Sequence, residues 1–308
     1  MKIIVTGGAG FIASHVVDRY IDLGHEVVVI DNLSTGVMEN INPKAKFYQM
    51  DICSEEILNV FEDEQPEIVN HHAAQISVPI SVKNPFLDLE VNGKGFLNIL
   101  ECCVKCNVKK VIFISSGGAI YGEATEYPTS EGYSPKPLSP YAIHKYLSEI
   151  YLHYYHESFG LDYTVLRYAN VYGPRQISTS EAGVVSIFIE TLLSGKTPYL
   201  FTYPETNEGM LRDYVYVKDV VKANELALCF ALNEVVNIGT GKATSTATIL
   251  REICKQMNKE YSPIIGQPRP GDIRQSCLNV TKAKNILNWQ AEHSLSESIK
   301  ETVDYFKQ

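Results

Sequence analysis

A tyrosine and a lysine lie four residues apart in Ser139-Pro-Tyr-Ala-Ile-His-Lys, a segment typical of a helix start. Residues four apart share one helix face, so the Tyr141 phenol and the Lys145 ammonium should be neighbours. A phenol with its ordinary pKa of about 10 is a poor base, but nearby cations favour the phenolate. Lys145 and a bound cationic ring together could lower that pKa by about two to three units. Such pairs are common on helix surfaces, yet this one is a candidate for proton transfer.

Two serines end the predicted strand of residues 110–116, in the run Ser115-Ser-Gly-Gly-Ala-Ile-Tyr-Gly122. Hydroxyls at the carboxyl end of a central parallel strand point into the crevice where open α/β sheets bind ligands. The same serines could instead cap the turn that follows the strand. Their place in the chain favours a functional role, which would put hydroxyl groups in the same crevice as the tyrosine.

The first 36 residues contain a turn that would hold a dinucleotide. An apolar strand leads into Thr6-Gly-Gly-Ala-Gly, a helix follows, and a second strand ends at Asp31. The glycines let the backbone approach a pyrophosphate, and the helix directs its free N–H groups and positive end at the same point. Asp31 can accept hydrogen bonds from an adenosine ribose, which favours NAD over its phosphorylated form.

A third predicted strand, residues 46–50, ends in the polar turn at Asp51 and Ile52. In a doubly wound sheet this turn lies beside the adenine of a bound dinucleotide. Asp51 could equally be the N-cap of a helix over residues 54–63, and the two interpretations are compatible. Both place Asp51 at the carboxyl end of the strand.

A fourth predicted strand starts at Glu67 and runs into Ala73 and Ala74. The two small side chains would let a cofactor pass closely over the end of the strand. His71 and His72 are adjacent, so in a strand they face opposite sides and cannot form a metal pair. They are interpreted as core or lid histidines.

The later chain continues this alternation and then loses it. We expect a helix over residues 85–106 that carries Asn92 and a strand over 161–167, while residues 173–212 hold one helix, a short apolar run and loops. Strand and helix patterns return at 212–239, and two or three helices follow. An acidic protein needs local positive charge to hold a diphosphate, and the candidates here are Arg212, Arg269 and Arg274. Single arginines, however, more often form ion pairs on the surface.

Composition excludes several classes of protein. The chain has 308 residues, 45% of them hydrophobic, and a formal net charge of -9. This charge argues against nucleic-acid or anionic-membrane binding, and no apolar run is long enough to span a membrane. Seven cysteines without a secretory leader predict free thiols in the cytoplasm. Cys103 and Cys106 have metal-ligand spacing, but no second pair exists, so we expect no metal.

At this point the sequence resembles the extended short-chain dehydrogenase/reductases, and within them the UDP-glucose 4-epimerase group of nucleotide-sugar epimerases. The resemblance covers nearly the whole chain. It is carried by Thr6-Gly-Gly-Ala-Gly-Phe-Ile, Asp31-Asn-Leu-Ser-Thr-Gly, His72-Ala-Ala-Gln, Ser115-Ser-Gly-Gly-Ala-Ile-Tyr-Gly, Tyr141-x-x-x-Lys145, Leu166-Arg-Tyr-Ala-Asn-Val-Tyr-Gly-Pro-Arg, Arg212-Asp-Tyr and Arg269-Pro-Gly-Asp.

The resemblance implies an α/β fold, with a doubly wound parallel Rossmann sheet and a smaller C-terminal α/β substrate domain. The first domain would comprise residues 1–172 with 213–240 returning to it, and the second would comprise 173–212 and 241–308. The implied reaction is NAD-dependent epimerisation at C4 of a UDP-hexose through a 4-keto intermediate. Tyr141 would take the proton of the 4-hydroxyl, and Lys145 would hold the nicotinamide ribose and favour the phenolate.

The resemblance also implies the residues of two binding sites. The cofactor residues are Gly7, Gly10, Phe11, Ile12, Asp31, Asn32, Leu33, Ser34, Thr35, Gly36, Asp51, Ile52, Ala73, Ala74, Gln75, Asn92, Tyr141 and Lys145. The substrate residues are Ser116, Gly117, Tyr141, Asn170, Val184, Tyr199, Phe201, Arg212, Arg269, Asp272, Arg274 and Ser276, with Ser116 also assigned to catalysis.

Three positions depart from the family pattern or bear on specificity. Ala13 replaces the usual third glycine of the fingerprint and should still allow close helix packing. Gly117 stands where many relatives carry the Ser or Thr that hydrogen-bonds the sugar, so either Ser116 takes that role or the tyrosine works without it. Ser276 falls at the family's gate beside the sugar, and its small side chain suggests room for a 2-acetamido group.

Two other functions compete with epimerisation. Related nucleotide-sugar dehydratases and decarboxylases usually carry an acid just before the Tyr-Gly of the fifth-strand motif, where this chain has Gly118-Ala-Ile. A catalytically silent NAD-binding protein need not keep Tyr141 and Lys145 on one face. Helices over residues 92–106 and 139–156 are apolar on more than one face, which predicts packing against a second subunit as a homodimer.

Overall fold

The computed structural model describes residues 1–178, 183–267 and 273–308. Its larger part is a parallel sheet of seven strands in the order β10-β6-β5-β4-β1-β2-β3. The strands are β1 (Lys2–Thr6), β2 (Glu26–Asp31), β3 (Lys46–Gln49), β4 (Ile68–His71), β5 (Lys110–Ser116), β6 (Asp162–Tyr168) and β10 (Glu234–Ile238). Most of their residues are buried and apolar because helices cover both faces of the sheet. This confirms the predicted doubly wound fold.

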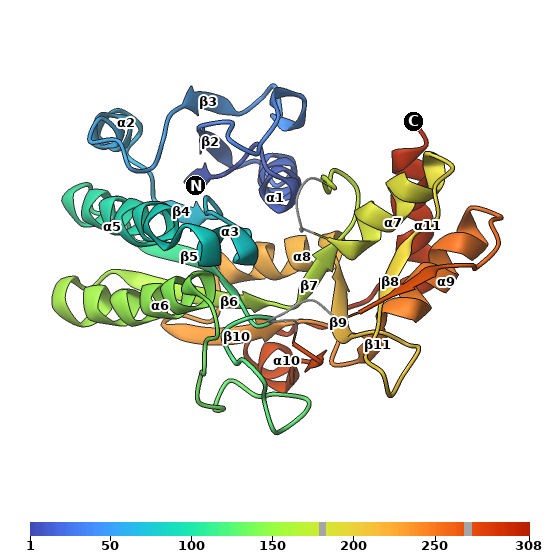
Figure 1. Cartoon of the computed structure of the whole chain (residues 1–308). Coiled ribbons are helices and arrows are strands. Elements are labelled where there is room, and N and C mark those ends of the chain that lie inside the picture. Colours follow the sequence, from blue (N-terminus) through green and yellow to red (C-terminus); the bar gives the residue numbers. More distant parts are fainter. Residues whose placement is uncertain (179–182, 268–272) are drawn as a thin grey trace.

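Two hydrophobic cores lie on opposite faces of this sheet. Each lies under the helices that Figure 1 shows on that face. On one face pack α1 (Phe11–Asp22), α8 (Val217–Ala227) and α10 (Thr281–Leu287). On the other face pack α2 (Ile57–Glu64), α5 (Phe96–Lys105) and α6 (Pro140–Phe159). The N-cap hydroxyl of Ser139 accepts a hydrogen bond from the Ala142 amide, so α6 starts where the sequence predicts.

The predicted helix over residues 85–106 is interrupted. It consists of α4 (Pro85–Asp88), the π-helical segment η2 (Leu89–Gly95) and α5, and the short helix α3 (Val78–Lys83) precedes it. A π turn adds a residue to the helical repeat and shows no periodicity signal of its own. For that reason the sequence pattern did not reveal it.

Asp51 does not cap a helix, because α2 begins only at Ile57. Its carboxylate accepts hydrogen bonds from the Cys53 amide and from the Asn32 side chain, each at 2.8 Å. The N-cap interpretation of Asp51 was therefore wrong. Asp51 instead closes the turn that follows β3 and links it to Asn32, which follows β2.

The smaller part of the molecule contains two further sheets. One has four strands, β7 (Asn170–Tyr172), β9 (Leu211–Tyr216), β11 (Ala243–Ser245) and β13 (Gln275–Ser276), and the other pairs β8 (Tyr199–Phe201) with β12 (Ile264–Gly266). A third core joins them to α7 (Val184–Leu193), α9 (Thr246–Gln256) and α11 (Leu295–Phe306). The 3-10 turn η1 (Met38–Asn40) follows β2.

Segments cross between the two parts more often than the predicted domain boundaries imply. The return segment 213–240 contributes β10 to the large sheet and α8 to the core on one of its faces, while β9 pairs within the smaller part. From the tail, α10 packs on β10 and α8, and the Trp289 indole donates to the Asp219 carbonyl at 2.9 Å. The two parts therefore share a buried seam, and the exact domain limits stay a prediction.

Among the residues described, none of the helices is both long and apolar enough to cross a membrane.

Candidate active site

A cavity of about 600 Å³ lies between the two parts of the molecule, at the carboxyl ends of the central strands. This is the usual ligand position in an open α/β sheet, and the volume suits a nucleotide-sized ligand. Twenty predicted residues line it: Gly7, Gly10, Phe11, Ile12, Asp31, Asn32, Ser34, Thr35, Asp51, Ile52, Ala73, Ala74, Ser116, Tyr141, Lys145, Asn170, Val184, Tyr199, Phe201 and Arg212.

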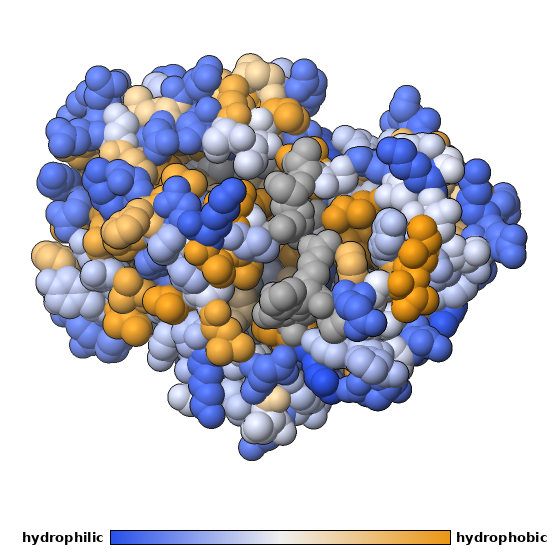
Figure 2. Space-filling view, in the orientation of Figure 1, coloured by the Kyte–Doolittle hydropathy of each residue, from blue (hydrophilic) through white to orange (hydrophobic). Residues whose placement is uncertain are grey.

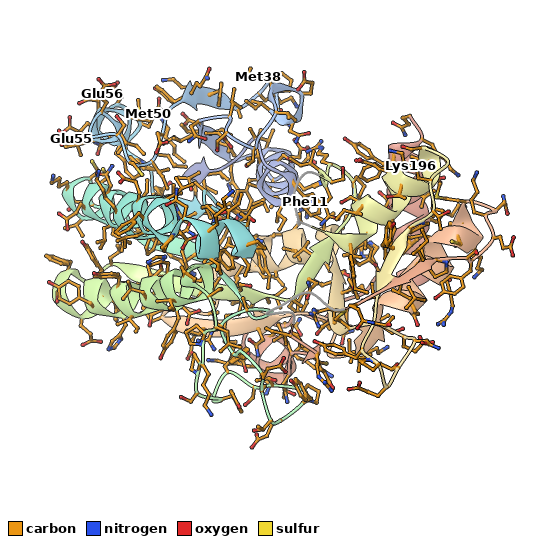
Figure 3. All side chains as sticks on the ribbon, in the orientation of Figure 1. Phe11, Met38, Met50, Glu55, Glu56 and Lys196 are labelled. Atoms are coloured by element: carbon orange, nitrogen blue, oxygen red, sulfur yellow. The ribbon has the colours of Figure 1, made fainter. Side chains whose placement is uncertain are left out.

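The glycine turn brings the backbone close to the end of β4. Gly7 has a φ of +72°, and a Cβ there would lie 2.7 Å from the Ala73 amide nitrogen. The Gly10 amide donates to the Gly7 carbonyl at 3.0 Å, and no side chain caps the helix that follows. The first N–H groups of α1 are therefore available to a diphosphate. Phe11 begins this helix at the border with the smaller part (Figure 3).

Asp31 is buried at the end of β2 and is held from two sides. Its carboxylate accepts hydrogen bonds from the Ala9 amide at 3.0 Å and the Leu33 amide at 2.8 Å. Leu33 and Gly36 do not line the cavity. A Cβ at Gly36 would lie 2.7 Å from the Ala9 side chain, so this glycine closes the loop behind the carboxylate.

Tyr141 and Lys145 lie together in the cavity wall, as their spacing predicts. The Lys145 ammonium lies 6.0 Å from the centre of the Tyr141 ring and donates to the Ile114 carbonyl at 2.8 Å. Burial lowers the pKa of Lys145 to about 8, although Asp88 and Glu149 oppose this. Burial raises the pKa of Tyr141 to about 12, although a hydrogen bond with Ser116 opposes this. The protein groups by themselves therefore keep the phenol protonated.

The two serines at the end of β5 have different partners. The Ser115 hydroxyl donates to the Glu149 carboxylate at 2.5 Å, and that carboxylate also binds Arg167. Ser116 lies against Tyr141, whereas Gly117 is outside the cavity lining. A Cβ at Gly117 would lie 2.6 Å from the Leu278 side chain, so residue 117 points into the core. Of the two alternatives for this motif, the geometry favours Ser116 as the hydroxyl beside the tyrosine.

Gln75 and Asn92 lie behind the cavity wall instead of in it. The Gln75 amide donates to the Asn92 side chain at 2.9 Å, and the Asn92 side chain donates to the Gln75 carbonyl at 2.9 Å. Both side chains also donate to the carboxylate of Asp88, at 2.6 and 3.0 Å. They therefore link the loop after β4 to η2.

The smaller part supplies the other wall of the cavity. Tyr199 and Phe201 are two residues apart in β8, so their rings lie on the same face of the strand. The rings stack with 6.5 Å between centroids and 16° between planes. Arg212 enters the cavity from β9, and Ser276 of β13 is its backbone neighbour. Arg274 binds Glu205 and lies over the Tyr203 ring, outside the cavity lining. Predicted residues Arg269 and Asp272 lie outside the described part of the chain.

Several lining residues were not among the predictions. They include His72 and Ile76 after β4, and Tyr172, Gln176, Ile177, Phe188, Met210, Tyr214 and Thr246 of the smaller part. His71 and His72 face opposite sides, as expected, since His71 packs against Phe96 while His72 lies in the cavity. Residues of the smaller part come from unconnected elements, so no local motif marks them.

Comparisons with known proteins agree with this geometry. The profile of the NAD dependent epimerase/dehydratase family matches residues 3–239. The crystal structure of UDP-glucose 4-epimerase from Thermotoga maritima with UDP-glucose is 49% identical, with a TM-score of 0.96, over 100% of this chain and 99% of that chain. UDP-glucose 4-epimerase from Thermus thermophilus in complex with NAD is 43% identical, with a TM-score of 0.94, over the same shares.

A third solved structure widens the range of sugars among the relatives. UDP-N-acetylglucosamine 4-epimerase from Methanobrevibacter ruminantium, in complex with UDP-N-acetylmuramic acid, is 36% identical with a TM-score of 0.93. The match covers 99% of this chain and 98% of that chain. Profile, relatives and fold agree, and the chain belongs to the NAD-dependent epimerase/dehydratase family.

Proposed function

We propose that the protein is an NAD-dependent isomerase that interconverts UDP-hexoses differing at C4, such as UDP-glucose and UDP-galactose. The observation that carries this proposal is the meeting of Tyr141, Ser116 and Lys145 with the glycine turn and Asp31 in one cavity. The matched relatives are named for this reaction. The open start of α1 and the carboxylate of Asp31 fit the diphosphate and ribose of NAD.

In the proposed mechanism, Tyr141 takes the proton of the sugar 4-hydroxyl and returns it at the end of the cycle. Ser116, hydrogen-bonded to Tyr141, orients the phenol toward the sugar. Lys145 is fixed by the Ile114 carbonyl and stabilises the phenolate. When bound, oxidised NAD supplies an acceptor for the hydride of the sugar C4 and a positive charge that favours the phenolate. Arg212 and Asn170 hold the nucleotide diphosphate while the sugar presents either face.

A dehydratase or decarboxylase is a weaker candidate, because Gly118-Ala-Ile carries no acid just before Tyr121-Gly of the fifth-strand motif. Incubating the protein with UDP-glucose, UDP-galactose and UDP-glucuronate, with and without added NAD, distinguishes the reactions by proton NMR of the products. The C4 epimer is the expected product. A 4-keto-6-deoxy sugar would indicate a dehydratase and a pentose would indicate a decarboxylase, and either product would reject the proposed epimerase. Unchanged substrates would indicate a silent NAD-binding protein.

We further propose that N-acetylated UDP-sugars are accepted. Ser276 is small and lies beside Arg212 in the register of β13 and β9, and a matched relative is named for UDP-N-acetylglucosamine. Ser276→Tyr should raise the KM for UDP-N-acetylglucosamine more than the KM for UDP-glucose. Equal effects on both substrates, or a wild-type protein strict for UDP-glucose, would reject this proposal.

We also propose a homodimer formed through α5 and α6. Figure 2 shows apolar surface over the part of the molecule where Figure 1 places α3, α5 and α6. Its exposed apolar side chains include Phe86 of the neighbouring α4 and Ile143, Ile150 and Tyr154 of α6. Apolar side chains that gather on an exposed surface often mark a subunit interface. Analytical ultracentrifugation should give twice the chain mass, whereas a monomer at all concentrations would exclude the dimer.

All seven cysteines are unpaired, which supports a reducing compartment such as the cytoplasm.

A further inference from the structure

A fully buried carboxylate, Asp88, lies behind the Tyr141 and Lys145 pair. It is the last residue of α4, and its side chain has no solvent exposure. Gln75 and Asn92 donate to its Oδ1, and the Nδ1 atom of His144 lies 2.5 Å from its Oδ2. A buried carboxylate is costly unless such donors surround it. One side chain thereby connects the loop after β4, η2 and α6.

His144 belongs to the same helix as the reactive pair, between Tyr141 and Lys145. It is nearly buried, with 11% of its side chain exposed, and it directs its ring at Asp88. The ring therefore ties this turn of α6 to the end of α4. A shift of either helix would break this contact and change where the phenol and the ammonium lie in the cavity.

The charge of Asp88 acts on both reactive groups. It opposes ionisation of Tyr141, whose pKa it raises, and it favours the charged form of Lys145, whose pKa it also raises. Glu149, one turn further along α6, acts on Lys145 in the same direction, but Arg167 neutralises it in a bidentate pair.

The remaining groups around Lys145 are held without charge. His71, at the end of β4, and His72, just after it, both feel the charge of Lys145. Burial together with this charge lowers the pKa of each histidine, so both are neutral near pH 7. Among the charged groups of the described residues that act on the pair, Asp88 acts on both members.

We propose that Asp88, held by His144, is a positioning residue that fixes the Tyr141 and Lys145 pair in the cavity and places a negative charge beside both. This inference rests on the proposed role of Tyr141 as the proton-transfer group. It assigns to the buried carboxylate the setting of the pH range in which the pair works.

Asp88→Asn tests the charge while keeping the size of the side chain. In the NAD-bound protein labelled with [ζ-13C]tyrosine, the signal that disappears in Tyr141→Phe reports the phenol. In Asp88→Asn the titration midpoint of this signal should fall by about one pH unit, and both limbs of the kcat/KM profile should move the same way. The control is Glu90→Gln, an exposed acid of η2 paired with Lys94, which should leave both unchanged.

His144→Leu provides a second route if Asp88→Asn does not fold. Without this contact the Asp88 carboxylate is held less firmly beside the pair, so its charge should raise the pKa of Tyr141 less and the Tyr141 midpoint should fall by less than one unit. His153→Leu, an exposed position of α6, is its control. Midpoints equal to those of the controls in the folded variants would overturn the inference. Wild-type turnover by Tyr141→Phe would instead overturn the proposed function.

Discussion

Tyr141 is the residue on which the proposed chemistry depends. Tyr141→Phe should keep NAD bound but lower turnover by at least about a hundredfold, the usual effect of removing a positioned proton-transfer group. Tyr154→Phe, an exposed tyrosine of the same helix, is the control and should behave as wild type. Bound NAD is measured from the absorbance of the purified protein, and turnover from the rate of epimer formation. Turnover near that of the control would mean that another group moves the proton.

Gly7 tests the dinucleotide site in the same way. Both Gly7 and Gly24 have positive φ angles, +72° and +80°, so alanine costs about 1 kcal/mol in backbone conformation at each. A Cβ at Gly7 meets the Ala73 backbone, whereas at Gly24 it meets nothing within 4 Å. Gly7→Ala should therefore lose NAD affinity by at least about tenfold in calorimetry, and Gly24→Ala should retain it. Equal affinities would show that the turn does not contact the cofactor.

Residues whose role depends on local structure could be predicted from the sequence. The glycine turn, Asp31 and the Tyr141 and Lys145 pair follow from short motifs, because strand, turn and helix geometry fixes their positions. Gly117 shows the limit of local motifs. Its motif position suggested contact with the sugar, yet a side chain at residue 117 would point toward Leu278. The direction of one residue at a strand end depends on the turn that follows, and spacing does not reveal this.

At the scale of elements, the strand and helix order of the larger part followed the hydrophobic pattern, because its strands are buried on both faces. The π-helical η2 and the register of β7, β9 and β13 left no such pattern. Cavity residues such as Gln176, Tyr214 and Thr246 come from separate short elements of the smaller part. They converge only through tertiary packing, which a single sequence does not encode locally.

The pairing of β8 with β12 gives a prediction at this scale. Gly266 of β12 leaves room for Phe201, since a Cβ there would lie 2.8 Å from the Phe201 ring. Gly266→Ala should tilt the aromatic pair of Tyr199 and Phe201 and raise the KM for UDP-glucose about three- to tenfold, with kcat and NAD affinity unchanged. The control is Gly132→Ala, because a Cβ there would make only an ordinary contact with the Ser130 hydroxyl, at 3.8 Å. An unchanged KM would show that this aromatic pair does not contact the substrate.

At the scale of the whole molecule, Glu64 links the end of α2 to two strands of the large sheet. Its carboxylate, 4% exposed, binds Lys2 of β1 and both Lys46 and Tyr48 of β3. Burial raises its pKa, but these hydrogen bonds outweigh burial and lower it to about 2. A lowered carboxyl pKa stabilises the fold above its ordinary value of about 4.5, and this stabilisation is lost as the pH falls toward 2.

Glu64→Gln should therefore lower the free energy of unfolding by about 1–2 kcal/mol at pH 7, and the difference from wild type should shrink below pH 4.5. Urea unfolding at pH 7 and pH 3.5 measures both. The control is Glu26→Gln, which removes a 66%-exposed partner of Lys2 and should change stability by less than about 0.5 kcal/mol. If the difference in the free energy of unfolding stayed constant with pH, the effect would come from packing and not from the charge of Glu64.

The two parts of the molecule close one cavity over a cofactor and a nucleotide sugar, and the central claim is that the hydrogen at C4 leaves and returns within it. UDP-[4-2H]glucose incubated with the NAD-bound protein in ordinary water tests this directly. We predict UDP-galactose that carries deuterium at C4, because the label is stored on the bound cofactor and returned. UDP-galactose with hydrogen from water at C4, or no UDP-galactose at all, would contradict the account.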